Sequence, residues 1–316
     1  MRRAIALPVA FAVALLALAG CAPLISEDGR MLSVYASFYP IYALTDALLD
    51  GIPDISLHCM AQPQDGCLRA YQLSDWDARL LASADAVIIG GRGLEAFEGT
   101  LFGWGEGGPA VAAVLYNLEL YNRSASHTTD EGSHLEGANP HLYMSIEGAR
   151  RMVEAIAAAL MTLDPAYADR YAQNESAALE RLDALSAQAE ALTAGLAGQP
   201  VILMNEALIY PARDCGLTAA AWIDRESGDA MDGSVLEECL ETLNESGAKV
   251  VLIERQAPAA LVESLKAAGY AVARIDVFST HREGERFDTY LERQLENARA
   301  ISEAYTQLKA EREESD

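Results

Sequence analysis

The segment that decides the fold is residues 145–196, SIEGARRMVEAIAAALMTLDPAYADRYAQNESAALERLDALSAQAEALTAGL. It is rich in Ala, Leu and Glu and predicts two helices, over 145–163 and 165–196. The second helix is long enough to cross from one domain to another. A helical connection of this kind permits small rocking motions and resists wide hinge opening.

Short apolar segments alternate with helical ones on both sides of this connection. The N-terminal side predicts strands over 32–38, 86–89 and 111–115 and helices over 41–49 and 74–82. The C-terminal side predicts strands over 201–204, 249–253 and 271–275 and helices over 235–243, 259–268 and 287–311. Such alternation favours parallel sheets that are covered by helices on both faces.

The predicted fold class is therefore α/β, with two α/β lobes that are joined by a long rigid connecting helix and that each contain a mainly parallel sheet. The lobes are expected over 32–144 and 198–316, and the helical connector over 145–197. A chain of 316 residues is long enough for two domains. A cleft is expected between the lobes, where the strand ends meet.

The first residues have the features of a bacterial lipoprotein export signal. Arg2 and Arg3 precede an apolar run that ends in Leu18-Ala19-Gly20-Cys21. The run is shorter than the roughly 20 residues of a membrane-spanning helix. We expect a signal peptide over 1–20 and a tether over 21–31. A lipid on Cys21 would then hold the protein outside the cytoplasm, on the bacterial membrane.

The chain is acidic, with a formal net charge of −24. This charge argues against nucleic acid or an anionic lipid surface as a partner, because both would be repelled. It favours cations, although an acidic surface also simply keeps a secreted protein soluble. We expect a monomer.

Four cysteines remain besides Cys21, an even number in an oxidising compartment. Of the three possible connectivities we expect Cys59 with Cys67, because the intervening residues include turn formers and close a short ring. Cys215 would then pair with Cys239. A thiolate metal site is the alternative, but the spacings match no zinc pattern.

Motifs of common enzyme classes are missing from the sequence. It contains no Gly-x-Ser-x-Gly, no His-Glu-x-x-His and no Cys-x-x-Cys. The acidic pair Glu237 and Glu238 lies on a predicted helix and is typical of a solvated face. We therefore expect a protein that is not an enzyme.

Four blocks resemble, in order, those of the zinc and manganese ABC-transporter substrate-binding proteins. They are SVYASFYPIY (33–42), ADAVIIGGRGLE (84–95), NPHLY (139–143) and VVLIERQ (250–256). The resemblance covers nearly the whole chain that follows the signal. It implies two α/β lobes with a rigid linking helix, which present a captured metal ion to a membrane permease.

The resemblance also implies a metal site of three histidines and one carboxylate. His141 matches one histidine position and Asp276 matches the carboxylate position. The other two histidine positions carry Arg69 and Asn205. A guanidinium has no lone pair and would repel a cation, so Arg69 cannot be a ligand. The standard tetrahedral zinc site is therefore incomplete.

Three alternatives address this incomplete site. Glu206 can replace the lost histidine, which gives His141, Glu206 and Asp276 as an oxygen-rich set better suited to manganese than to zinc. His127 and His134, in the polar loop over 122–139, can collect metal. In the third alternative Arg69 pairs with Asp276, either as a structural ion pair or as one side of a pocket for an anionic or metal-chelate ligand.

Aromatic and polar residues beside these positions complete the expected cleft. Tyr39, Tyr71 and Tyr143 are expected to line its walls, and His281 is a further candidate near Asp276. Glu254 is expected to have a structural hydrogen-bonding role.

The sequence thus predicts a lipid-anchored solute-binding protein of a zinc or manganese ABC importer, with a permease and a divalent cation as partners. The alternative is a diverged member of the same family. Such a member binds a chelate or an anionic ligand, or acts as an adhesin or regulatory lipoprotein.

Overall fold

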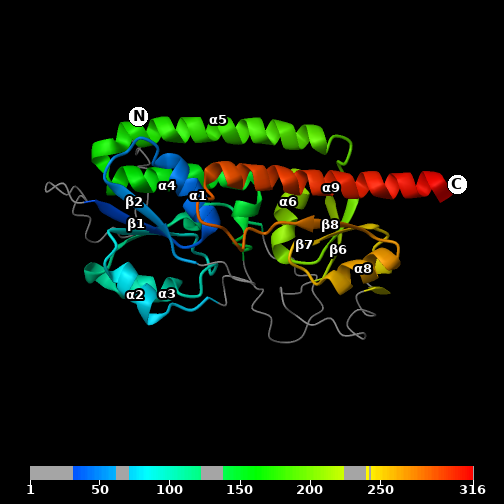
Figure 1. The fold of residues 1–316 in the computed structure, drawn as a ribbon, viewed down its shortest axis with the longest axis horizontal. Coiled ribbons are helices and arrows are strands. Elements are labelled where there is room, and N and C mark those ends of the chain that lie inside the picture. Colours follow the sequence, from blue (N-terminus) through cyan, green and yellow to red (C-terminus); the bar gives the residue numbers. More distant parts are fainter. Residues whose placement is uncertain (1–30, 62–70, 122–137, 224–239, 242, 316) are drawn as a thin grey trace, which may run out of the picture.

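The computed structural model describes residues 31–61, 71–121, 138–223, 240–241 and 243–315 of the chain. Two four-stranded sheets lie side by side, and long helices run along one side of both (Figure 1). All strand pairs in both sheets are parallel. The predicted α/β fold with two lobes is confirmed.

The N-terminal sheet has the strand order β2-β1-β3-β4. Its central strand β3 is apolar throughout and buried on both faces, as parallel strands between two helical layers are. Ala86 and Ile88 face one hydrophobic cluster, whereas Val87 and Ile89 face another. The elements of this lobe are β1 (Leu32–Ala36), α1 (Tyr39–Leu48), β2 (Ile55–Cys59), α2 (Asp75–Ala82), β3 (Ala86–Ile89), α3 (Glu98–Gly103), η2 (Gly105–Gly107), β4 (Ala110–Ala113) and η3 (Val114–Asn117).

The C-terminal sheet repeats this order as β6-β5-β7-β8. Its central strand β7 also alternates between two clusters, with Leu252 in the larger cluster and Val251 in the smaller one. The elements of this lobe are β5 (Pro200–Leu203), η6 (Glu206–Leu208), α6 (Ile209–Asp214), β6 (Thr218–Trp222), β7 (Val250–Glu254), α8 (Ala259–Ala267), β8 (Ala271–Ile275) and α9 (Phe287–Ser315).

The connection between the lobes contains η4 (Leu142–Met144), α4 (Ile146–Leu163), η5 (Pro165–Tyr167) and α5 (Ala168–Leu192). Ser145 caps α4, because its side chain accepts a hydrogen bond from the N–H of Gly148. Helices α4 and α5 are the two helices predicted over 145–163 and 165–196. In Figure 1, α5 runs along both lobes as its predicted length requires.

Helix α9 also spans both lobes, which the sequence did not predict. Near its start, Arg286 forms an ion pair with Asp46 of α1. Near its end, the Tyr305 hydroxyl donates to the carbonyl oxygen of Pro200, the first residue of β5 (2.8 Å). Ser302 bonds to the carbonyl oxygen of Leu192 at the end of α5 (2.7 Å). Two long helices therefore brace the lobes (Figure 1).

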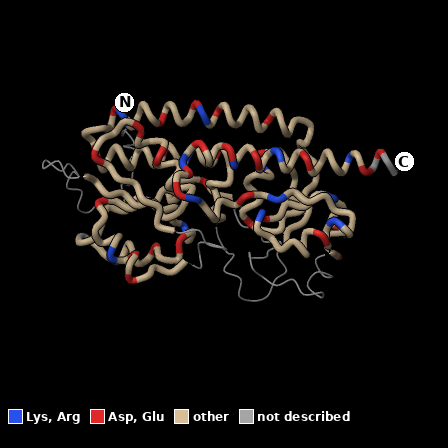
Figure 2. The backbone as a smooth tube through the Cα atoms, in the orientation of Figure 1, with Lys and Arg blue, Asp and Glu red and all other residues tan. Residues whose placement is uncertain are grey.

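One large hydrophobic cluster contains residues of both lobes and of the connecting helices, such as Val34, Ile156 and Leu203. This shared core and the two bracing helices oppose wide opening between the lobes. Acidic and basic positions are interspersed along α5 and α9 (Figure 2). None of the helices in the described ranges combines the length and hydropathy of a membrane span.

The described residues include one cysteine of each predicted disulfide. Cys59 and Cys215 are free thiols, and burial raises the pKa of each to about 12. Their predicted partners, Cys67 and Cys239, lie outside the described residues, so both pairings stay predictions. Cys21 lies outside them too.

Candidate functional site

The two sheets share a topological feature that places the site. In each sheet the first strand in sequence lies between the second and the third, so the chain leaves it on both sides. Ligands of open parallel sheets bind beyond the carboxyl ends of the strands at such a switch point. These ends are followed by Ser37 and Gly90 in the N-terminal lobe. In the C-terminal lobe they are followed by Met204 and Arg255.

The N-terminal switch point is closed by a buried carboxylate. Glu95 is 2% exposed and accepts hydrogen bonds from the Ser37 hydroxyl (2.7 Å) and from the N–H groups of Gly90 (2.7 Å) and Gly91 (2.8 Å). Burial raises the pKa of Glu95, and these three donors oppose that rise. Gly91 has a φ of 79°, which a residue with a side chain rarely adopts. This turn is built to hold Glu95.

The C-terminal switch point carries Asn205 and Glu254. The Asn205 amide donates to Glu254 Oε1 (3.0 Å), and its oxygen accepts from the N–H of Ala207 (2.8 Å). The second bond caps η6, which begins at Glu206. Hydrogen bonds therefore fix both the nitrogen and the oxygen of the Asn205 amide, and this sets the position of Glu206, the next residue. The structural hydrogen-bonding role expected of Glu254 agrees with this contact.

His141 lies at the start of the connection between the lobes and is 6% exposed. Its Nδ1 is 2.8 Å from Asn139 Oδ1, which also accepts from the His141 main-chain N–H (3.1 Å). Because this oxygen can only accept, it favours the proton on Nδ1 and leaves the lone pair of the neutral ring on Nε2. Such a contact orients a histidine that binds metal.

Glu206 of the C-terminal lobe lies beside His141. Its Oε1 is 3.5 Å from His141 Nδ1, and its main-chain oxygen accepts from the Asn139 amide (2.8 Å). The Tyr210 hydroxyl of α6 donates to the carbonyl oxygen of Asn139 (2.6 Å). Two of the predicted ligands are thus brought together, and Asn139 fixes both.

The structure does not bring Asp276 into a three-ligand group with them. Its carboxylate is held by both edges of the Arg293 guanidinium, Nη2 to Oδ1 and Nε to Oδ2, each at 2.8 Å. Arg255 adds a second contact at 3.3 Å. Within the described ranges, no three His, Cys, Asp or Glu side chains are arranged to hold a metal ion. The bidentate arginine is the physical reason that Asp276 is engaged elsewhere.

Asp276 pairs with Arg293, and its predicted pairing with Arg69 stays a prediction. Arg69 lies outside the described residues, as do His127 and His134. Tyr71 is buried in the N-terminal lobe and packs edge-on against Phe97 at 5.8 Å between ring centroids. Burial raises its pKa to about 12. The structure therefore gives Tyr71 a packing role.

The other two predicted tyrosines lie where the lobes meet. Tyr143 packs between Phe38 of the N-terminal lobe and Phe278 of the C-terminal lobe, at 5.0 and 6.4 Å between ring centroids. Tyr39 stacks on His281 at 5.5 Å. The sequence analysis missed Asn139 and Arg293. Asn139 stands in the quoted NPHLY block, whereas nothing distinguishes Arg293 from the other charged residues of its helix.

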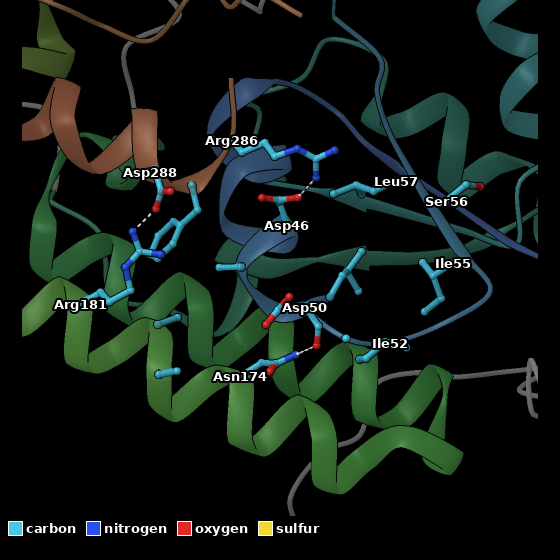
Figure 3. Close-up of a pocket in the computed structure, with 16 residues that line it drawn as sticks. Asp46, Asp50, Ile52, Ile55, Ser56, Leu57, Asn174, Arg181, Arg286 and Asp288 are labelled. Carbon is cyan, nitrogen blue, oxygen red and sulfur yellow. Dashed lines mark hydrogen bonds and ion pairs between the residues drawn. The ribbon is translucent and has the colours of Figure 1, made fainter. Parts of the chain in front are cut away.

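Two hollows flank these residues, and neither is lined by His141 or Glu206. The larger, about 700 Å³, lies between α1, β2, α5 and the start of α9 (Figure 3). Its arginines form ion pairs, Arg286 with Asp46 and Arg181 with Asp288. The smaller, about 420 Å³, is lined by Asp276, Arg293 and Arg255 among others.

Comparisons with known proteins agree with this architecture. The model of the ZnuA family, described as zinc-uptake complex component A, periplasmic, matches residues 34–304.

Three similar solved structures share the fold at low sequence identity. FpvC of Pseudomonas aeruginosa in complex with Mn²⁺ is 23% identical, with a TM-score of 0.76 over 88% of this chain and 99% of its own. The Zn(II)-bound ZnuA-like domain of Streptococcus pneumoniae AdcA is 20% identical, with a TM-score of 0.71 over 87% and 98%. Lmb of Streptococcus agalactiae, described as a bifunctional protein with adhesin and metal transporting activity, is 19% identical, with a TM-score of 0.68 over 86% and 99%.

Proposed function

Since this chain belongs to the family of the periplasmic zinc-uptake component ZnuA, we propose that it is the solute-binding component of an ABC importer for a divalent metal ion of the zinc or manganese type. It captures the ion between its lobes, with His141 and Glu206 as ligands, and delivers it to a permease. A lipid on Cys21 holds it at the outer side of the membrane.

The observation that carries this proposal is the contact of His141 with Glu206. One imidazole and one carboxylate suit borderline cations such as Zn²⁺ and Mn²⁺, and the anionic oxygen lowers the charge of the site. His141 precedes the connecting helices and Glu206 belongs to the C-terminal lobe, 3.5 Å apart. Glu206 lies on the Nδ1 side of the ring, and the lone pair is on Nε2, so both residues bind one ion once the Glu206 carboxylate has turned toward Nε2. Such an ion joins the two parts, and its binding stabilises the folded chain.

The test is thermal unfolding of the purified, chelator-stripped protein with added Zn²⁺ or Mn²⁺. At an ion concentration 100 times the Kd the expected stabilisation is about 2.7 kcal/mol, which raises the Tm by several degrees. The His141→Ala variant loses this rise, because the proposed nitrogen ligand is gone. Glu206→Gln keeps the side-chain shape and weakens binding by about tenfold or more.

His58 offers a matched control, because it is an exposed histidine of β2 that stacks on Tyr35 (4.9 Å). His58→Ala keeps the ion-dependent rise in Tm. A wild-type protein without any rise, or equal loss in both histidine variants, contradicts the proposed function.

A further inference from the structure

Asp276 is the carboxylate expected to complete the metal site, yet in this chain it is bound by arginine. We propose that Arg293 takes the place of the metal ion at Asp276. Asp276 is then a structural residue, and the transported ion is held without it. This inference rests on the proposed function, since it concerns which residues of that site bind the ion.

The first support is the fixed position of Asp276, which is 9% exposed. Arg293 contacts both carboxylate oxygens, and the N–H of Phe278 donates to Oδ1 (2.8 Å). Asn297 of α9 bonds to the main chain of Asp276 twice, accepting from its N–H (2.7 Å) and donating to its oxygen (2.9 Å). Neither the carboxylate nor its backbone is left to adapt to another partner.

The second support is the equally complete environment of Arg293, which is also 9% exposed. Its Nη1 donates to the Thr280 carbonyl oxygen (3.0 Å) and to Glu285 (3.3 Å). The guanidinium lies over the rings of Tyr39 (4.8 Å) and Phe278 (5.0 Å). These contacts use the planar, permanently charged fork that distinguishes arginine from lysine.

The third support is the connection that this arginine makes between the lobes. Tyr39 belongs to α1 of the N-terminal lobe, whereas Asp276, Phe278 and Arg293 belong to the C-terminal lobe. The Arg293 guanidinium therefore contacts both lobes, as a bound metal ion would. A second cation that approached Asp276 would be repelled by Arg293 and by Arg255, whose Nη1 is 3.3 Å from Oδ2.

The fourth support is the solvent access of Asp276. It lines the smaller hollow of about 420 Å³ together with Arg255, His281 and Arg293. His141 and Glu206 do not line that hollow, so within it the Asp276 carboxylate is beside arginines and not beside the two proposed ligands. Several contacts, and not the rotamer of one side chain, thus keep Asp276 out of the expected ligand set.

The decisive test is isothermal titration calorimetry with Zn²⁺ and with Mn²⁺ on the chelator-stripped wild-type protein and on two variants. The double variant Asp276→Asn/Arg293→Met removes both partners of the pair, so no buried charge is left alone. We expect its Kd to stay within about threefold of the wild-type value. In contrast, Arg293→Met alone frees the carboxylate and is expected to tighten binding by about tenfold or more.

The remaining outcomes separate this inference from the proposed function. A wild-type protein that binds neither ion overturns both. Wild-type binding that the double variant weakens tenfold or more overturns this inference alone, because it shows that Asp276 ligates the ion. Unchanged affinity in Arg293→Met, measured on protein that circular dichroism shows to be folded, also overturns it. In that case the arginine does not keep the Asp276 carboxylate from the ion.

Discussion

The two lobes have the same strand order and the same parallel directions, yet they use their switch points differently. In the N-terminal lobe the polar groups at this point satisfy one another, because Glu95 takes its three donors from its own lobe. In the C-terminal lobe the segment after β5 holds Asn205 and then places Glu206 next to His141. In the N-terminal lobe the polar groups at the strand ends bond to one another, whereas the C-terminal lobe places a carboxylate beside His141.

This difference indicates a division of roles between two similar sheets. The Gly90-Gly91 turn and Glu95 make the N-terminal strand ends rigid. They leave contact with the rest of the chain to Phe38 and Tyr39, which pack on Tyr143 and His281, and to the ion pair of Asp46 with Arg286. The C-terminal lobe contributes the charged groups Glu206 and Asp276.

The largest expected effect tests whether Glu95 is structural. Glu95→Ala leaves the Ser37 hydroxyl and two buried N–H groups without their acceptor, at about 1 to 3 kcal/mol each. We expect the free energy of unfolding in urea to fall by about 4 kcal/mol. The control is Glu180→Ala on the exposed face of α5, which should change it by less than about 0.5 kcal/mol. A loss below about 1 kcal/mol for Glu95→Ala would show that this switch point is not closed by Glu95.

A smaller effect is expected at the C-terminal switch point. Asn205→Ala removes the bond to Glu254 and the cap of η6, so we expect a loss of about 2 kcal/mol. Ser37→Ala, directly after β1, removes one bond and should lose about 1 kcal/mol. Both are measured by urea unfolding without added metal. The reverse order would contradict the view that Asn205 organises its switch point more than Ser37 does.

Most of the fold could be predicted from the sequence, because the buried strands and long helices have clear periodicity. The strands over 86–89 and 271–275 are confirmed with their predicted bounds. Strands β2 and β6 were missed. Each is one of the two outer strands of its sheet. Their sequences, ISLHC and TAAAW, are partly polar or rich in alanine and lack the continuous apolar pattern of the central strands.

The site could be predicted only in part. His141 and Glu206 lie in contact, as predicted. The family resemblance pointed to both, because His141 stands within a matching block and Glu206 stands next to the position of a missing histidine. The role of Arg293 depends on a contact with Asp276 across 17 residues and on a ring from the other lobe, Tyr39. No local spacing encodes such a contact. An arginine on a long amphipathic helix has the same sequence pattern whether it faces solvent or a buried carboxylate.

The smallest expected effect is a pH dependence at the N-terminal switch point. Burial raises the pKa of Glu95 above the value of an unfolded chain, and its three hydrogen bonds only partly oppose this. The folded state therefore holds the proton more tightly than the unfolded state. The stabilisation that this group contributes is complete below the unfolded pKa and is lost as the pH rises through the folded value.

Glu95→Gln removes this titration, so the wild-type protein should lose stability relative to the variant as the pH rises from 4 to 8. Urea unfolding of both proteins at each pH measures the difference. Thr45→Val is the control, because the Thr45 hydroxyl donates to the Ile41 carbonyl oxygen and does not ionise, so its difference from wild type should not vary with pH. A flat difference for Glu95→Gln, or one of opposite sign, would mean that the hydrogen bonds to the carboxylate outweigh its burial. The N-terminal switch point would then favour a charged group, as a ligand site does.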